Sequence, residues 1–198
     1  MTMETLSQAI RCLRKQHYYQ YRQKDLFALF IVLLCWYFFH LLSQQFSLLP
    51  RFFTSFFLMA FMTAFATFLV RKFLIVLFML FIALLLMGSL PDLTALGNNV
   101  YLILFFSGVF FEILYLFLFM ETHVVPFDVI FTLSFSFAAL PLFTFLVLSP
   151  GTFIAHIVPV LNFMLIDFFL TLFATGLAFL LWFHLRTKKL FVAFEYKN

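Results

Sequence analysis

One acidic residue inside an apolar stretch is the part of this sequence best suited to chemistry. Glu112 lies within the apolar run 100–120, with Gly108 one helical turn before it and Tyr115 close behind it. A charged side chain inside a hydrocarbon layer costs several kcal/mol unless it is paired or hydrated, so such residues mark ion or substrate pathways. We therefore expect Glu112 and Tyr115 to line a path for a proton or a substrate. The alternative is a protonated Glu112 that is hydrogen-bonded across a helix interface.

Asp167 is a second acidic residue in an apolar run, and small residues follow it at helical spacing: Thr171, Ala174, Thr175 and Ala178. A similar set occurs earlier in the chain: Ala60, Thr63, Ala64 and Thr67. Small and hydroxyl-bearing faces are typical of closely packed membrane helices. We expect both faces to point into a bundle while the Phe-rich faces meet lipid. Asp167 and Asn162 would then join Glu112 along the same path.

The segment METHVVPFD, residues 120–128, interrupts two Phe-rich runs with polar residues. We interpret it as a loop that docks a cytosolic partner through Glu121, His123, Pro126 and Asp128. The alternative is a plain hairpin, in which Pro126 ends a helix and Asp128 provides the N-cap of the next one.

Composition restricts the class of protein. The chain has 198 residues, of which 66% are hydrophobic and only 10% charged, far from the balance of soluble domains. The net charge of +4 does not indicate nucleic-acid binding, because the basic residues lie at the ends of apolar runs. Neither Cys12 nor Cys35 belongs to a metal-binding pattern, and no catalytic motif such as GxSxG, HExxH or a P-loop occurs. We expect no catalytic residues, metal or cofactor.

The apolar runs predict an all-α polytopic membrane protein with about six transmembrane helices. The expected spans are 26–42, 52–70, 73–88, 100–120, 129–148 and one within 153–183. The last run would be about 46 Å long as a single helix, longer than a bilayer core is thick. We therefore expect Pro159 to break it, so that 160–183 cross the membrane. A pair of short re-entrant helices is the alternative.

Positive charges predict the orientation of these spans. With both termini inside, eleven of the twelve Lys and Arg residues fall on the inner side, and Arg51 alone falls outside. Four aromatic residues lie near span ends, where an aromatic belt is expected: Trp36, Tyr37, Tyr101 and Trp182. Three parts follow: an amphipathic interfacial segment 1–25, a six-helix transmembrane domain 26–185, and a basic inner-side tail 186–198. The alternative for 1–25 is ordinary orienting charge before a first span.

Three family resemblances accompany this pattern. SLLPRFFTSFFLMAFMTAFATFLVRKF and AALPLFTFLVL resemble spans of the haem exporter B permease of cytochrome c maturation, an ABC-2-type permease. GVFFE at 108–112 and LSP at 148–150 resemble motifs of the twin-arginine translocase C subunit, which implies that Glu112 belongs to an intramembrane site. ETHVVPFD is similar to a loop of the quinone-site membrane subunit of respiratory complex I.

From these patterns we expect a permease-like or translocase-like subunit of a larger complex, in a bacterial or mitochondrial inner membrane. The exporter resemblance implies a cytosolic ATPase beside other membrane subunits as partners. A membrane subunit of a respiratory assembly is the first alternative, and a lipid-modifying enzyme is the second.

Overall fold

The computed structural model describes residues 23–45, 51–70, 74–87, 99–122, 125–148, 151 and 157–185. These ranges are helical, so the all-α prediction is confirmed for the described part of the chain. The helices are α2 (Gln23–Gln45), α3 (Arg51–Val70), α4 (Ile75–Met87), α6 (Asn99–Thr122), α7 (Val125–Ala138), α8 (Leu140–Leu148) and α9 (Ile157–Leu185). The predicted tail 186–198 and most of the predicted segment 1–25 lie outside the described residues.

Three helical stretches are long and apolar enough to cross a membrane. They are Gln23–Leu42, Pro126–Leu148 and Ile157–Leu185. The apolar parts of α3 and α6, Thr54–Val70 and Leu102–Leu118, are shorter. α4 has 13 residues and is about 20 Å long, less than the thickness of a hydrocarbon core. Length and composition thus identify three candidate spans where the sequence predicts six.

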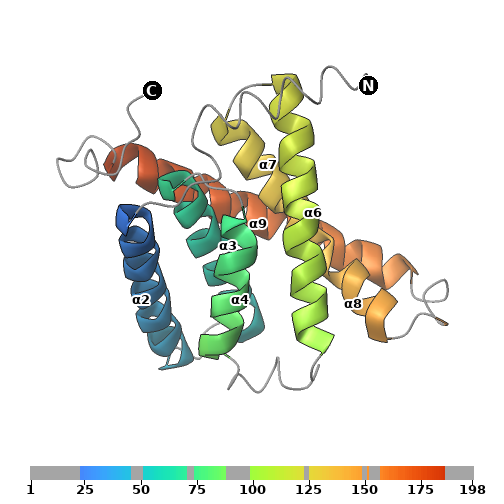
Figure 1. The fold of residues 1–198 in the computed structure, drawn as a ribbon. Helices are drawn as coiled ribbons and strands as arrows, with labels where there is room; N and C mark the ends of the chain where they lie inside the picture. The colour runs from blue at the N-terminus through green and yellow to red at the C-terminus, as the bar shows by residue number, and fades with distance from the viewer. Residues whose placement is uncertain are drawn as a thin grey trace.

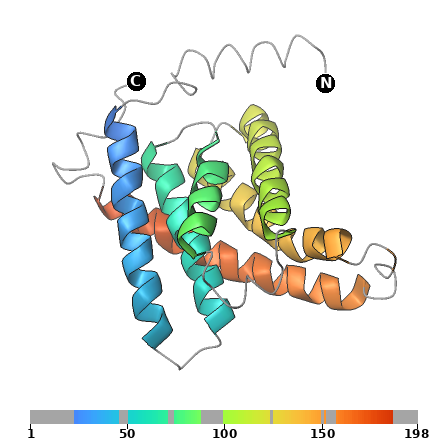
Figure 2. The same ribbon diagram turned by 60° about the horizontal axis from the view of Figure 1, so that its bottom comes forward.

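Four helices close a ring at the centre of the molecule. α3 packs against α4, α4 against α6, α6 against α7, and α7 against α3. α2 packs on the outside of α3, while α9 packs on α3 and α7. Figures 1 and 2 show α9 running across the other helices rather than alongside them. A side chain that points inward from α3, α4, α6 or α7 is therefore surrounded by other helices.

α2, α3, α4, α6 and α7 alternate in direction along the chain, whereas α8 continues from α7 and α9 crosses the others (Figures 1 and 2). α6 and α7 form an antiparallel hairpin, in which Ser107 donates a hydrogen bond of 3.0 Å to the carbonyl oxygen of Ser136. α3 and α9 run the same way, because Phe57 lies beside Phe173 and Phe68 beside Trp182, with ring centroids 6.1 and 5.8 Å apart. The start of α2 and the end of α9 lie on the same side of the molecule (Figure 1).

Two prolines act differently from the sequence prediction. Pro159 does not break the last helix, because it is the third residue of α9. Backbone amides in the first turn of a helix form no intrahelical hydrogen bond, so the N–H that proline lacks is not needed there. The expected fifth span is instead divided at Ala139 into α7 and α8. Pro141 follows this turn and cannot donate to the carbonyl of Phe137, which explains the interruption. The bonds Ala139 N to Phe135 O and Phe143 N to Ala139 O, both 3.0 Å, keep the two helices continuous.

The interior contains the two predicted small-residue faces. All eight side chains of these faces are buried: Ala60, Thr63, Ala64 and Thr67 on α3, and Thr171, Ala174, Thr175 and Ala178 on α9. Their prediction is confirmed. The aromatic-belt prediction is wrong for Trp36 and Trp182, which are only 1% and 7% exposed, whereas Tyr37 is 42% exposed. Trp182 stacks on Phe68 in the α3–α9 contact, which removes it from the surface.

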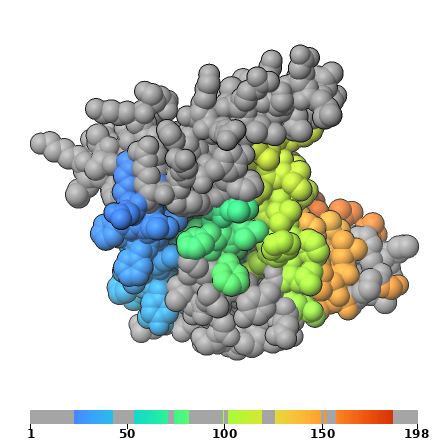
Figure 3. All heavy atoms as spheres, viewed as in Figure 1, coloured from blue at the N-terminus to red at the C-terminus, as the bar shows by residue number. Residues whose placement is uncertain are grey.

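The outside of the described structure is apolar. Exposed phenylalanines occur on α2, α6 and α9, including Phe38, Phe105, Phe117 and Phe169. In the view of Figure 3, the side chains of α2, α4, α6 and α8 form much of the described surface. An apolar exterior around a core with buried polar groups is the arrangement that a lipid environment favours.

Candidate functional site

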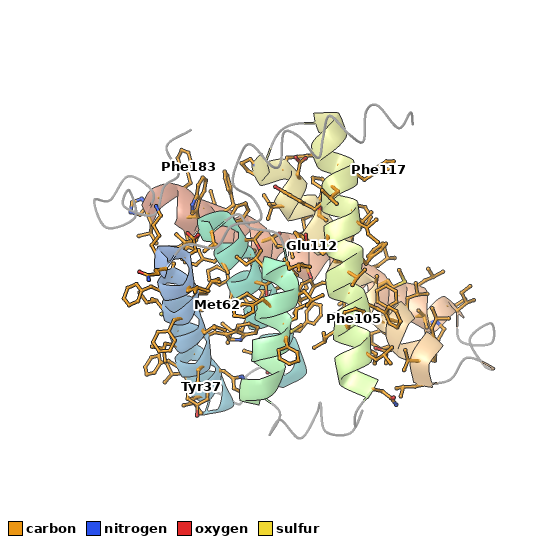
Figure 4. The ribbon with its side chains drawn as sticks, viewed as in Figure 1. Tyr37, Met62, Phe105, Glu112, Phe117 and Phe183 are labelled. Atoms are coloured by element: carbon orange, nitrogen blue, oxygen red, sulfur yellow. The ribbon has the colours of Figure 1, made fainter. Side chains whose placement is uncertain are left out.

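Glu112 is buried in the middle of α6. Its side chain is 5% exposed, and neither carboxyl oxygen has a hydrogen-bond partner of ordinary geometry. Figure 4 shows Glu112 on the side of α6 that faces α4, with Phe117 on the other side. Tyr115, one turn later, is also buried and stacks on Phe111. The structure thus brings Glu112 and Tyr115 together on one helix, as the sequence predicts, without a partner for the Glu112 carboxyl.

The first turn of α4 lies beside this carboxyl. The backbone amide of Leu74, the residue before α4, faces Glu112. Leu74 accepts the first helical bond of α4, from Phe78 N at 2.9 Å, so it occupies the N-cap position. A leucine side chain cannot cap the free amides of a first turn. The carboxyl of Glu112, from another helix, lies beside this positive helix end.

Leu74 also has an unusual backbone conformation. Its φ is 61°, in the left-handed region that leucine seldom adopts. Strain of this kind persists only where the surrounding structure imposes it, and it often marks functional sites. The start of α4 is thus fixed by its packing rather than by its own sequence.

Gly108 sets the distance between α4 and α6. A Cβ atom added at Gly108 would lie 3.2 Å from the Cβ and 3.3 Å from the Cα of Leu77. A side chain at position 108 would press on Leu77, so this close approach favours glycine at the contact. Because Leu77 is in the first turn of α4 and Gly108 is near the middle of α6, the α4 N-terminus lies at mid-height in the ring, at the level of Glu112.

A polar face on α7 is the feature that sequence reasoning missed. Asp128, Thr132 and Ser136 recur every fourth residue and are fully buried. Thr132 donates a hydrogen bond to the backbone carbonyl of Asp128, and the hydroxyl of Ser136 has no partner. In the sequence, this face is visible as polar residues at every fourth position of DVIFTLSFS, residues 128–136. The pattern is not recognised when Asp128 is assigned to the loop before the helix.

Asp167 and Asn162, both on α9, have different surroundings. Asp167 is 5% exposed and belongs to the buried face of α9, which begins at Val160. Asn162 is exposed, so it is not part of that face. Two further hydroxyls without partners, those of Thr63 and Thr171, lie in the interior. Among the described residues, no three Asp, Glu, His or Cys side chains gather where a metal ion could be held.

The docking segment proves to be mostly helical. α6 continues to Thr122 and α7 begins at Val125, so the link is 123–124 and His123 lies outside the described residues. Glu121 belongs to the last turn of α6, and Pro126 is half-buried in the first turn of α7. Asp128 is the fourth residue of α7 rather than its N-cap, and its side chain is inside the molecule.

The described residues form a helical protein with buried acidic residues and three apolar helical stretches long enough to span a membrane. Comparison with protein-family models, curated proteins and solved structures gave no match to this chain. The three family resemblances therefore stay predictions, and the function is argued from the residues alone.

Proposed function

We propose that this chain is a permease-like or translocase-like membrane subunit that lets a substrate move across or within the bilayer. The observation that carries the proposal is the set of buried polar groups without partners: the carboxyl of Glu112 and the hydroxyls of Thr63, Ser136 and Thr171. Buried polar groups in a stable core are almost always hydrogen-bonded, and exceptions need an explanation such as water or an ion. A path that is hydrated or occupied during transport supplies that explanation.

Six spans with both termini inside remain our topology. The alternating directions of α2, α3, α4, α6 and α7 support it, as do the positions of the start of α2 and the end of α9 on one side of the molecule (Figure 1). In this topology α4 is a short span whose first turn packs against the middle of α6, beside Glu112. Interrupted or short helices of this kind build substrate sites in transporters, because their ends carry free backbone groups.

Water access to Ser136 tests the proposal without knowledge of the substrate. Ser136→Cys, in a chain with Cys12→Ser and Cys35→Ala, is expected to react with a membrane-impermeant anionic thiol reagent in intact vesicles. The matched control is Phe105→Cys, on the apolar surface, which should react only with a lipid-soluble maleimide. If the thiol of the Ser136→Cys variant reacts with neither reagent while that of the Phe105→Cys variant reacts with the maleimide, the interior is dry and the transport proposal is wrong.

Partners are proposed to be other membrane subunits and a cytosolic ATPase that docks at the link between α6 and α7. Mild-detergent purification of the full chain should recover the ATPase, and replacing residues 121–124 with Gly/Ser should release it. This exchange leaves α7 intact from Val125. Asp128→Asn is the control, because the buried side chain should not affect docking. Recovery of flavin, iron–sulfur or haem subunits instead would favour the respiratory alternative.

A further inference from the structure

The surroundings of Glu112 contain two opposing influences on its charge. The carboxyl is almost completely enclosed, without a hydrogen-bond partner, which favours the neutral acid. The N-terminal end of α4, marked by the Leu74 amide, carries partial positive charge and favours the carboxylate. A carboxyl stabilised in both forms by its surroundings is suited to take up and release a proton.

The described helices that pack against α6 carry few charged groups. α6 packs against α4, α7 and α8. The sequences of α4 and α8 contain no titratable side chain, and α7 contributes Asp128. On α6 itself, Tyr115 is the nearest such residue. α4, α6, α7 and α8 contain no Lys, Arg or His, so no basic side chain of these four described helices could hold Glu112 permanently ionised. The remaining ring helix, α3, has one basic residue, Arg51, at its first position.

A metal cation fits this position poorly. Hard cations need about six oxygen ligands, and the described residues contain no cluster of three acidic, His or Cys side chains. The partial positive charge of the α4 N-terminus would also repel a cation. A proton requires only the carboxyl oxygen itself.

We propose that Glu112 is a proton-exchanging site, in which the N-terminal end of α4 stabilises the carboxylate after the proton leaves. This inference rests on the proposed function and names the proton as the ion coupled to transport. On protonation the carboxylate takes H⁺ from hydronium, and on release the proton returns to water. Loss of the charge weakens the attraction between α6 and the end of α4, which links the proton to the position of α4.

Carbodiimide modification tests the proposal, because the reagent adds to a protonated carboxyl and ends as a stable N-acylurea. We expect dicyclohexylcarbodiimide to modify Glu112 in the purified full chain in nanodiscs, as measured by peptide mass spectrometry. The yield should fall about tenfold for each pH unit above the midpoint of the reaction. Glu112→Gln should lose this adduct, while the overall fold, followed by circular dichroism, stays unchanged.

A second readout separates a proton-exchanging Glu112 from a purely structural one. Infrared difference spectra between acid and alkaline samples should show a protonated-carboxyl band that is absent in Glu112→Gln. A band that does not change with pH, or a Glu112 that stays unmodified at every pH while Asp167 reacts, would overturn the inference. If the inference about Glu112 fails in this way but the Ser136→Cys thiol still reacts with the impermeant reagent, the proposed transport function keeps its support. If that thiol does not react, the proposed function itself is contradicted.

Discussion

Glu112→Lys is expected to prevent stable folding in the membrane. The new ammonium group would be buried without a partner and would face the partial positive charge of the α4 N-terminus. Burying an uncompensated charge in this way costs about 3–5 kcal/mol, a large share of the stability of a domain. The measurement is the amount of full-length protein recovered from membranes, together with its thermal unfolding in detergent.

Glu112→Gln is the matched variant for this prediction. Its neutral side chain has nearly the same shape and can accept from the free amides of α4, so its recovery and melting temperature should be close to those of the original protein. Equal recovery of the Lys and Gln variants would show that position 112 is hydrated in the free protein, contrary to the enclosed site in the structure.

Gly108→Leu is expected to separate α4 from α6. Any side chain at this position would meet the backbone and Cβ of Leu77, which cannot move without shifting the whole helix. Overpacking of this kind costs about 1–3 kcal/mol or more. Thermal unfolding of the purified protein in detergent would show a lower melting temperature, and the shift of α4 should also change the carbodiimide reactivity of Glu112.

Gly176→Leu provides the control. A Cβ atom added at Gly176 meets no atom within 4 Å, so the larger side chain has open space on the surface of α9. Its melting temperature should equal or exceed that of the original protein, since leucine favours helix more than glycine does. If both variants melted at the same temperature, Gly108 would not set the α4–α6 contact.

Sequence patterns were sufficient for the features that depend on local periodicity. The apolar runs identified the helices, and the spacing of Ala60, Thr63, Ala64 and Thr67 identified the buried face of α3. Asp167 and the small residues after it identified most of the buried face of α9 in the same way. Helical periodicity fixes which residues share a face, and a face of small residues is the one that packs closely against another helix.

Other features depended on neighbours that are distant in the sequence. Pro159 and Pro141 have the same chemistry, yet only Pro141 interrupts a helix, because the effect depends on where the helix begins. Asp128 resembles an N-cap locally but lies inside α7 and inside the core. Asn162, which the sequence predicts to line the path, is exposed because α9 turns its other face towards α3 and α7.

By itself, the sequence determined that this chain is a set of apolar helices carrying a few acidic residues, among which Glu112 was the foremost candidate. Only the tertiary structure decided what surrounds Glu112. The strained start of α4 at Leu74 and the close contact of Leu77 with Gly108 place a helix end beside the carboxyl. The contact between the start of α4 and the middle of α6 arises from packing between segments about 35 residues apart in the sequence, and no local sequence pattern encodes it.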